Sequence, residues 1–209
     1  MSLIQQFVAD ATLKPVVPAG PEQTPATAPS KTVLHVGCGP KRPGKLHRSF
    51  HTPEWREIRL DIEPRVQPDI VASITDMHPV ATDSMDAVWS SHNLEHLEAF
   101  QVPIALGEFL RVLKPGGKLL ITLPDLQTVA KLVAEDKLED AAYVSPAGPI
   151  APIDTIYGHR ASIAAGMPYM AHRTGFTLRT LTAALQRAGF VGINTQRTEF
   201  DLWAAALKP

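Results

Sequence analysis

The stretch VLHVGCGPKRPG, Val33 to Gly44, passes from a short apolar run into three glycines, a cysteine and two prolines. Apolar and β-branched residues before Gly37 are typical of a buried strand, and glycines permit the sharp turn that follows. In α/β proteins, ligands bind where the carboxyl ends of such strands meet. The stretch therefore predicts a strand that ends at the floor of a ligand site.

Composition limits the classes of function that the chain can have. Its 209 residues suffice for one domain with a sizeable core, and its net charge of −1 provides no general basic field for nucleic acid. The single cysteine excludes an internal disulfide and suits a reducing compartment. We see no secretory signal and no apolar run of about 20 residues, so we expect a cytoplasmic protein without a membrane span.

We expect the chain to have two parts. Residues 1–30 would hold a short amphipathic helix at 3–13 and a linker with five prolines, and residues 31–209 would form the folded domain. The helix would either cover the ligand site or pair two subunits as a homodimer, and its spacing leaves both open.

Strand and helix patterns alternate along the domain, which predicts an α/β fold with a mostly parallel sheet covered on both faces. Apolar spacing after Pro103 and a cap at Thr177 predict two of the helices. Residues 142–175 lack either pattern and predict a lid or binding loop. The predicted strands cover 32–36, 56–60, 69–73, 87–90, 118–123, 191–197 and 200–207.

Three ligands fit a glycine turn of this kind, and the first is a dinucleotide. Its fingerprint needs a third glycine and a helix to receive the pyrophosphate, but Arg42 stands at the glycine position and Pro43 follows. A dinucleotide is therefore disfavoured.

A metal ion is the second. HNLEH, His92 to His96, matches the H-x-x-E-H pattern of inverted zinc proteases. The segment directly follows a predicted strand rather than lying within a long helix, so we expect no metal ligand here and assign His96 a structural role.

S-adenosylmethionine (SAM) is the third, and it has no phosphate to bind. It needs a close glycine turn, an acid for the ribose hydroxyls and a polar group for the adenine edge. The turn at Gly37–Gly39, Asp61 and Asp76 provide these in order, each after a predicted strand.

The sequence resembles the class I SAM-dependent methyltransferases, of the small type-11 kind. The segments that carry the resemblance are VLHVGCGP, REIRLDIEP, DIVASITDM, MDAVWSSHNLEHL and FLRVLKPGGKLLITLPD, with HRTGFTLRTLTAALQRAGF later in the chain. The resemblance implies a Rossmann-like, seven-stranded, mostly parallel sheet with helices on both faces and an antiparallel last strand.

The resemblance also assigns residues to the cofactor. Gly37, Cys38 and Gly39 would line its methionine and ribose side, and Asp61 would accept hydrogen bonds from the ribose. The remaining cofactor contacts, from the ends of the second to fourth strands, would be Ile62, Asp76, Met77, Ser90 and Ser91. Two departures from the family pattern are His35, where relatives carry an acid, and Pro40, where they often carry a third glycine.

Histidine is the residue best suited to take a proton from an acceptor near neutral pH. We rank His92 first as a general base and His159 second. Around the expected lid, Tyr157, Arg160, His172 and Arg173 would contact the acceptor, which we expect to be a small molecule rather than nucleic acid. A non-catalytic, methyltransferase-like binding or scaffold protein is the alternative, and a zinc hydrolase using HNLEH is a lesser one.

Overall fold

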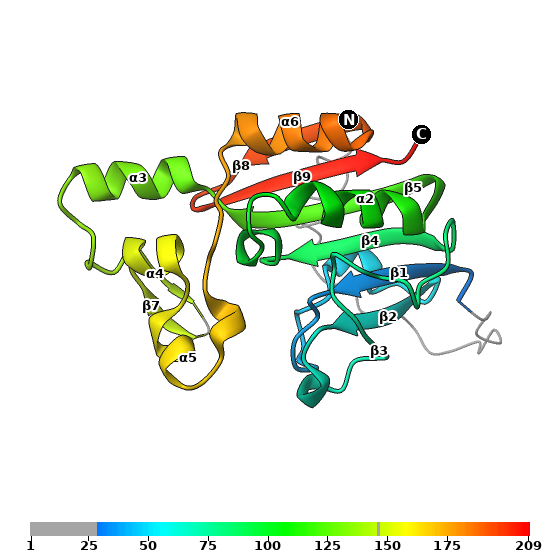
Figure 1. Cartoon of the computed structure of the whole chain (residues 1–209), viewed down its shortest axis with the longest axis horizontal. Coiled ribbons are helices and arrows are strands. Elements are labelled where there is room, and N and C mark those ends of the chain that lie inside the picture. The colour runs from blue at the N-terminus through cyan, green and yellow to red at the C-terminus, as the bar shows by residue number, and fades with distance from the viewer. Residues whose placement is uncertain (1–28, 146) are drawn as a thin grey trace, which may run out of the picture.

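The computed structural model describes residues 29–145 and 147–209. The helix expected at 3–13 and most of the expected linker lie outside the described residues. Within them, seven strands form one sheet in the order β3-β2-β1-β4-β5-β9-β8, with β6 and β7 as a separate hairpin (Figure 1). No described helix is both long enough and apolar enough to cross a membrane.

The first five strands of the sheet are parallel, and β9 runs antiparallel to both of its neighbours. The predicted seven-stranded sheet with an antiparallel last strand is therefore confirmed. The strands are β1 (Lys31–Val36), β2 (Trp55–Asp61), β3 (Ile70–Val71), β4 (Met85–Ser91), β5 (Leu113–Pro124), β8 (Val191–Arg197) and β9 (Asp201–Leu207).

Two helices, α2 (Val102–Val112) and α6 (Leu178–Ala188), lie on the same face of the sheet (Figure 1). Thr177 caps α6 as predicted, because its side chain accepts a hydrogen bond from Thr180 N, and Gly189 ends it with φ 97°. Phe109 and Leu181, one from each helix, are fully buried in the core between helices and sheet.

The opposite face of the sheet has a smaller, aromatic cluster. Trp89 and Trp203 lie on neighbouring parts of this face, and Phe50 of the short 3-10 helix η1 (Arg48–Phe50) packs into the same cluster. Of the helical elements in the described residues, η1 alone contributes a residue to this cluster. The other short helix near this end of the chain, η2 (Pro64–Val66), buries no residue. This face is therefore open enough to hold a cavity, described below.

The segment at 142–175 is folded rather than structureless, which corrects the sequence expectation. It contains the hairpin of β6 (Tyr143–Ser145) and β7 (Gly148–Ile150), then α4 (Pro152–Tyr157), α5 (Arg160–Ala164) and η4 (Pro168–Met170). Helix α3 (Leu126–Ala134) contacts α4, and these elements lie to one side of the sheet (Figure 1). Short elements in local contact explain why no extended apolar pattern marks them in the sequence.

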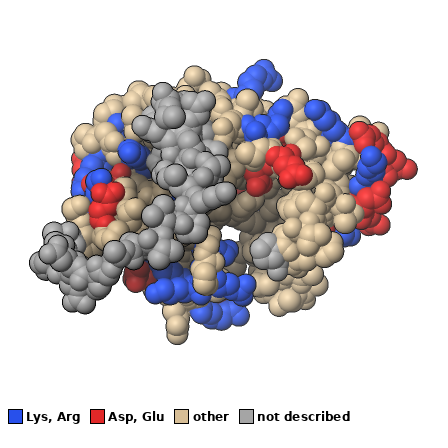
Figure 2. Space-filling view, turned by 180° about the vertical axis from the view of Figure 1, so that it is seen from behind, with Lys and Arg blue, Asp and Glu red and all other residues tan. Residues whose placement is uncertain are grey.

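Lys and Arg side chains form one cluster low on the rear face, and others lie beside acidic side chains elsewhere on it (Figure 2). The segment between β1 and β2 contributes Lys41, Arg42, Lys45 and Arg48 to the positive charge. The visible face carries both signs of charge, and the whole chain has a net charge of −1.

Candidate functional site

The site is built where the order of the strands reverses. Strand β1 has β2 on one side and β4 on the other, so the carboxyl ends of β1 and β4 form a topological switch point. Asn93, just past β4, joins the two ends: its Nδ2 donates to Val36 O at 2.9 Å and to Ser90 Oγ at 3.2 Å. The predicted strand ends therefore meet in space.

The turn after β1 depends on glycine. Gly37 and Gly39 have φ of 55° and 58°, in the left-handed region that side chains disfavour. Strand β2 then holds the turn from both sides, since Gly39 N donates to Asp61 Oδ2 at 2.8 Å and Arg59 donates to Gly39 O. Arg59 is 8% exposed and was not singled out by the sequence.

The ribose-binding role expected of Asp61 is compatible with its position. Each of its oxygens accepts one backbone N–H, from Gly39 and from Glu63, which leaves further lone pairs on both oxygens. Ile62 beside it is 49% exposed, an apolar surface available to stack against a flat ring. An acidic group and an exposed apolar side chain thus lie next to the glycine turn.

The two residues expected at the adenine edge, Asp76 and Met77, differ in their exposure. Asp76 is largely exposed, five residues past the end of β3, and its Oδ1 accepts from His78 N. Met77, expected beside Asp76, has no exposed surface, and its side chain lies in the main core.

Two other expected cofactor contacts are also covered. Ser90 is fully buried with its hydroxyl on Asn93, and Cys38 is 1% exposed. Burial raises the pKa of the Cys38 thiol to about 11. Both side chains are therefore covered by protein, whereas Ser91 lines a cavity.

His92 is held in a special position at the end of β4. Its φ of 54° is unusual for a residue with a side chain, and its ring lies between two carboxylates. Nδ1 is 3.3 Å from Glu95 Oε1 and Nε2 is 3.8 Å from Asp201 Oδ1. Burial lowers the pKa of His92, but the two carboxylates outweigh it and the net pKa is raised.

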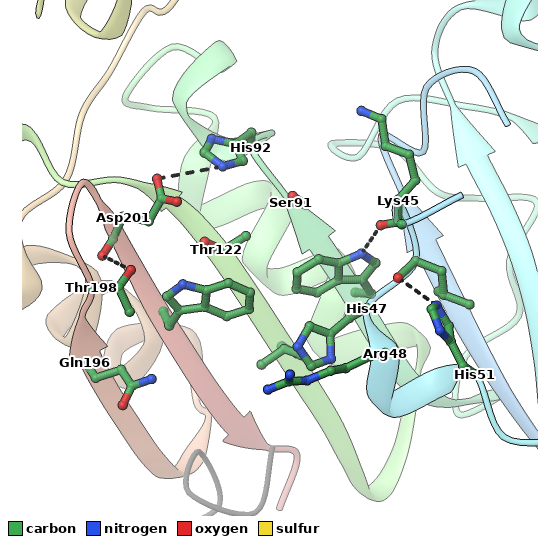
Figure 3. Close-up of a pocket in the computed structure, with 15 residues that line it drawn as sticks. Lys45, His47, Arg48, His51, Ser91, His92, Thr122, Gln196, Thr198 and Asp201 are labelled. Carbon is green, nitrogen blue, oxygen red and sulfur yellow. Dashed lines mark hydrogen bonds and ion pairs between the residues drawn. The ribbon is translucent and has the colours of Figure 1, made fainter. Parts of the chain in front are cut away.

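A cavity of about 560 Å³ opens beside His92 on the aromatic face of the sheet (Figure 3). Trp89 and Trp203 stack at 5.8 Å between ring centroids, and His47 lies 5.3 Å from the Trp89 ring. Burial lowers the pKa of His47 to about 4, so this ring is neutral at pH 7. Such a volume and such walls suit a small organic ligand.

The lid residues do not converge on this cavity. Arg160 pairs with Asp154 at 2.8 Å, and Arg173 pairs with Glu98 at 2.9 Å. His159 Nδ1 lies 2.7 Å from Ser162 Oγ, and Tyr157 is 63% exposed.

Among the expected lid contacts, His172 and Arg173 reach the segment that follows β4, and His172 does so through its ring. Its ring meets that of His96 edge to face, with centroids 4.8 Å apart. Sequence reasoning missed this contact, and it also missed Asn93, Arg59 and Asp201, because each acts through a partner distant in the chain.

Residues 34–121 match the family model of a methyltransferase domain. This stretch of the chain is similar to a methyltransferase domain. The resemblance to class I SAM-dependent methyltransferases is thereby confirmed, and solved structures support the same fold.

A SAM-dependent methyltransferase from Methanosarcina mazei is similar at 17% identity and a TM-score of 0.57, covering 88% of this chain and 94% of that one. A second one, from Listeria monocytogenes, is similar at 18% identity and 0.56, covering 86% and 90%.

The third similar structure contains ligands. It is the Burkholderia thailandensis 1,6-didemethyltoxoflavin-N1-methyltransferase with bound 1,6-didemethyltoxoflavin and S-adenosylhomocysteine, at 16% identity and a TM-score of 0.53, covering 85% and 71%. Among proteins of curated function, none matches the sequence significantly. At these identities the similar structures show that the domain has their fold.

Proposed function

We propose that the protein is a SAM-dependent methyltransferase that acts on a small molecule. The observation that carries the proposal is the position of His92: it follows β4 at the switch point, two residues after Ser90, and lines the cavity. The cofactor crevice and the acceptor cavity would therefore share one strand end. A single cysteine is consistent with a location in the reducing cytoplasm. That two copies of the chain form a homodimer stays a prediction.

The residues at the switch point fit the cofactor. A Cβ on Gly37 would lie 1.8 Å from Asn93 Oδ1, so the turn beside the proposed cofactor site requires glycine at this position. Asp61 would accept from the ribose hydroxyls, with Ile62 against the adenine. When bound, SAM would supply a methyl group on its sulfonium sulfur, and S-adenosylhomocysteine would be the leaving group when the acceptor's lone pair attacks the methyl carbon.

The cavity would hold and orient the acceptor. The Trp89 and Trp203 rings provide flat apolar walls, which favour an aromatic or heteroaromatic acceptor. Thr122 also lines the cavity, and its buried hydroxyl has no hydrogen-bond partner among the described residues. A polar group of the acceptor would satisfy that hydroxyl and fix the orientation of the ring.

His92 would take the proton of a hydroxyl or ammonium acceptor. Its ring is 42% exposed toward the cavity side, whereas Glu95 behind it is 2% exposed. Glu95 and Asp201 would orient the ring and stabilise the imidazolium that forms, so His92 is the group that touches the acceptor and the two acids position it.

The second candidate function is a non-catalytic binding protein with the same fold. His35 favours it, because this buried histidine pairs with Glu57 at 2.6 Å at the position where relatives carry an acid. The amino group of the cofactor would then lack its usual anchor.

Methyl transfer can be tested with SAM labelled on the methyl group and a set of small hydroxy- and amino-heteroaromatic compounds. We expect labelled product and S-adenosylhomocysteine to form only when an acceptor is present, and not with the Asp61→Ala variant. Tight cofactor binding without transfer to any compound, from folded protein, would favour the non-catalytic alternative.

A further inference from the structure

Glu95 is a buried acid with one charged neighbour, His92, and no hydrogen bond to its carboxylate from the described residues. It is 2% exposed, and neither of its carboxylate oxygens has a hydrogen-bond partner within residues 29–145 and 147–209. His92 Nδ1 lies 3.3 Å from Oε1, but outside hydrogen-bonding geometry. A buried carboxylate of this kind is costly, and native proteins normally pair it with donors or with a metal ion.

Two imidazoles beside this acid have their proton positions fixed. His96 Nδ1 lies 3.1 Å from Ala171 O, and His172 Nδ1 lies 2.7 Å from Thr155 O. A carbonyl oxygen can only accept, so each Nδ1 carries the proton, and in the neutral ring Nε2 has a free lone pair. A backbone carbonyl on the second nitrogen is the usual support of metal-binding histidines.

The three side chains are close enough to share an ion. One ligand atom from each of Glu95, His96 and His172 lies within 4.8 Å of the other two. Ligands of a tetrahedral ion with bonds of about 2.0–2.1 Å are about 3.3 Å apart, so the group would contract by up to about 1.5 Å around a bound ion.

The backbone already holds the two parts of this group together. Glu95 O accepts from Arg173 N at 2.8 Å and from Thr174 N at 3.2 Å, which ties the segment after η4 to η3 (Leu94–His96). The 3-10 helix thus presents Glu95 and His96 next to each other, while the lid segment supplies His172. These backbone hydrogen bonds hold the two segments together without any ligand.

We propose that Glu95, His96 and His172 form a binding site for a divalent first-row transition-metal ion of the zinc type. Two imidazoles and one carboxylate favour such an ion over Mg²⁺ or Ca²⁺, which prefer oxygen ligands alone. Three protein ligands are also the number found in zinc sites that keep a position open for water or substrate.

This site differs from the zinc-protease pattern considered from the sequence. That pattern would use His92 and His96, whereas here His92 contacts the outer side of the Glu95 carboxylate and also faces Asp201. The third ligand comes from His172, 76 positions after His96. The proposal replaces the structural role expected of His96 and the acceptor contact expected of His172, and it does not depend on the proposed methyl transfer.

The test uses the full chain, freed of metal with a chelator and titrated with ZnCl₂ in competition with a chromophoric chelator. We expect one equivalent of Zn²⁺ to bind, and His172→Ala and Glu95→Gln to weaken that binding by at least about 100-fold. His159→Ala is the matched control, because this lid histidine contacts Ser162 instead, and its affinity should equal that of the wild type.

Circular dichroism of each variant would show whether it is folded. If Glu95→Gln does not fold, His172→Ala still decides the result, because His172 lies at the edge of the cluster and is partly exposed. Zinc affinity that is equal in wild type and His172→Ala, or binding of Mg²⁺ in preference to Zn²⁺, would overturn the proposal. S-adenosylhomocysteine binding, measured on the same metal-free protein, reports separately on the proposed function.

Discussion

The amide side chain of Asn93, just after β4, lies directly on the bare backbone of Gly37, just after β1. A Cβ at position 37 would lie 1.8 Å from its Oδ1, and its Nδ2 donates to Val36 O. This contact links the two strands between which the sheet order reverses. Several properties of the site depend on it.

Gly37→Ala should disrupt both stability and cofactor binding. The new Cβ would overlap Asn93 and force alanine to a φ near 55°, so we expect a loss of about 2–4 kcal/mol in the free energy of unfolding. Gly44→Ala is the matched control, because its φ is 82° but no atom lies within 4 Å of the new Cβ. It should cost about 1 kcal/mol. Urea unfolding measures the free energy of unfolding of both variants. Equal losses in the two variants would contradict the close approach of Asn93 to Gly37.

His92→Asn should lower kcat by about 10²- to 10⁴-fold for a hydroxyl or ammonium acceptor, since the proton would lose its base. Binding of S-adenosylhomocysteine should stay within a factor of about three, because His92 lines the acceptor cavity. The comparison variant is His159→Asn, at the other histidine predicted from the sequence. If that variant lost activity while His92→Asn kept it, the assignment of the base would be wrong.

Cys38 should be a poorly reactive thiol. It is the single cysteine of the chain, it is 1% exposed, and burial raises its pKa to about 11. At pH 8 a dithio-bis-nitrobenzoate reagent should therefore modify native protein at least about 100-fold more slowly than denatured protein. Fast stoichiometric labelling of the native protein would show that the glycine turn is open. Saturating S-adenosylhomocysteine should slow the native reaction further.

Asp125→Ala should destabilise the junction between β5 and the lid elements. Asp125 is fully buried; it caps α3 through Gln127 N, accepts from Thr128 Oγ1, and pairs with Arg197. Loss of the cap and of the partner for Arg197 should cost about 2–4 kcal/mol. Glu135→Ala removes an exposed pair with Lys137 and should leave the unfolding midpoint unchanged. A small effect at Asp125 would mean that α3 is held mainly by its packing on α4.

Much of the sheet can be predicted from the sequence, because its central strands β1, β4 and β5 are largely buried and contain apolar runs. Helix α2 and the second half of β5 follow from such patterns, but β5 begins at Leu113, five residues before the predicted strand at 118–123. Thr177 and Gly189 mark the ends of α6. The β3 strand is only two residues long, so the five-residue run at 69–73 overestimates it. The elements within 142–175 are too short to produce a period.

The sequence could predict a site residue only where the end of its own strand places it, without a partner from elsewhere in the chain. Gly37 and Asp61 are placed by the ends of their own strands. The contact of His96 with His172 and the position of His92 between Glu95 and Asp201 depend on segments that are far apart in the chain. No local pattern encodes those distances, which explains why the buried cluster emerges only in three dimensions.

The most direct test of the central claim is calorimetric titration of the protein with S-adenosylhomocysteine, alongside Asp61→Asn. The asparagine keeps the size of the side chain and one oxygen for Gly39 N but removes the charge that would bind the ribose. We predict one site per chain with a micromolar Kd, weakened by at least about tenfold in the variant. No binding to folded wild-type protein, or equal binding by the variant, would contradict a cofactor site at this switch point.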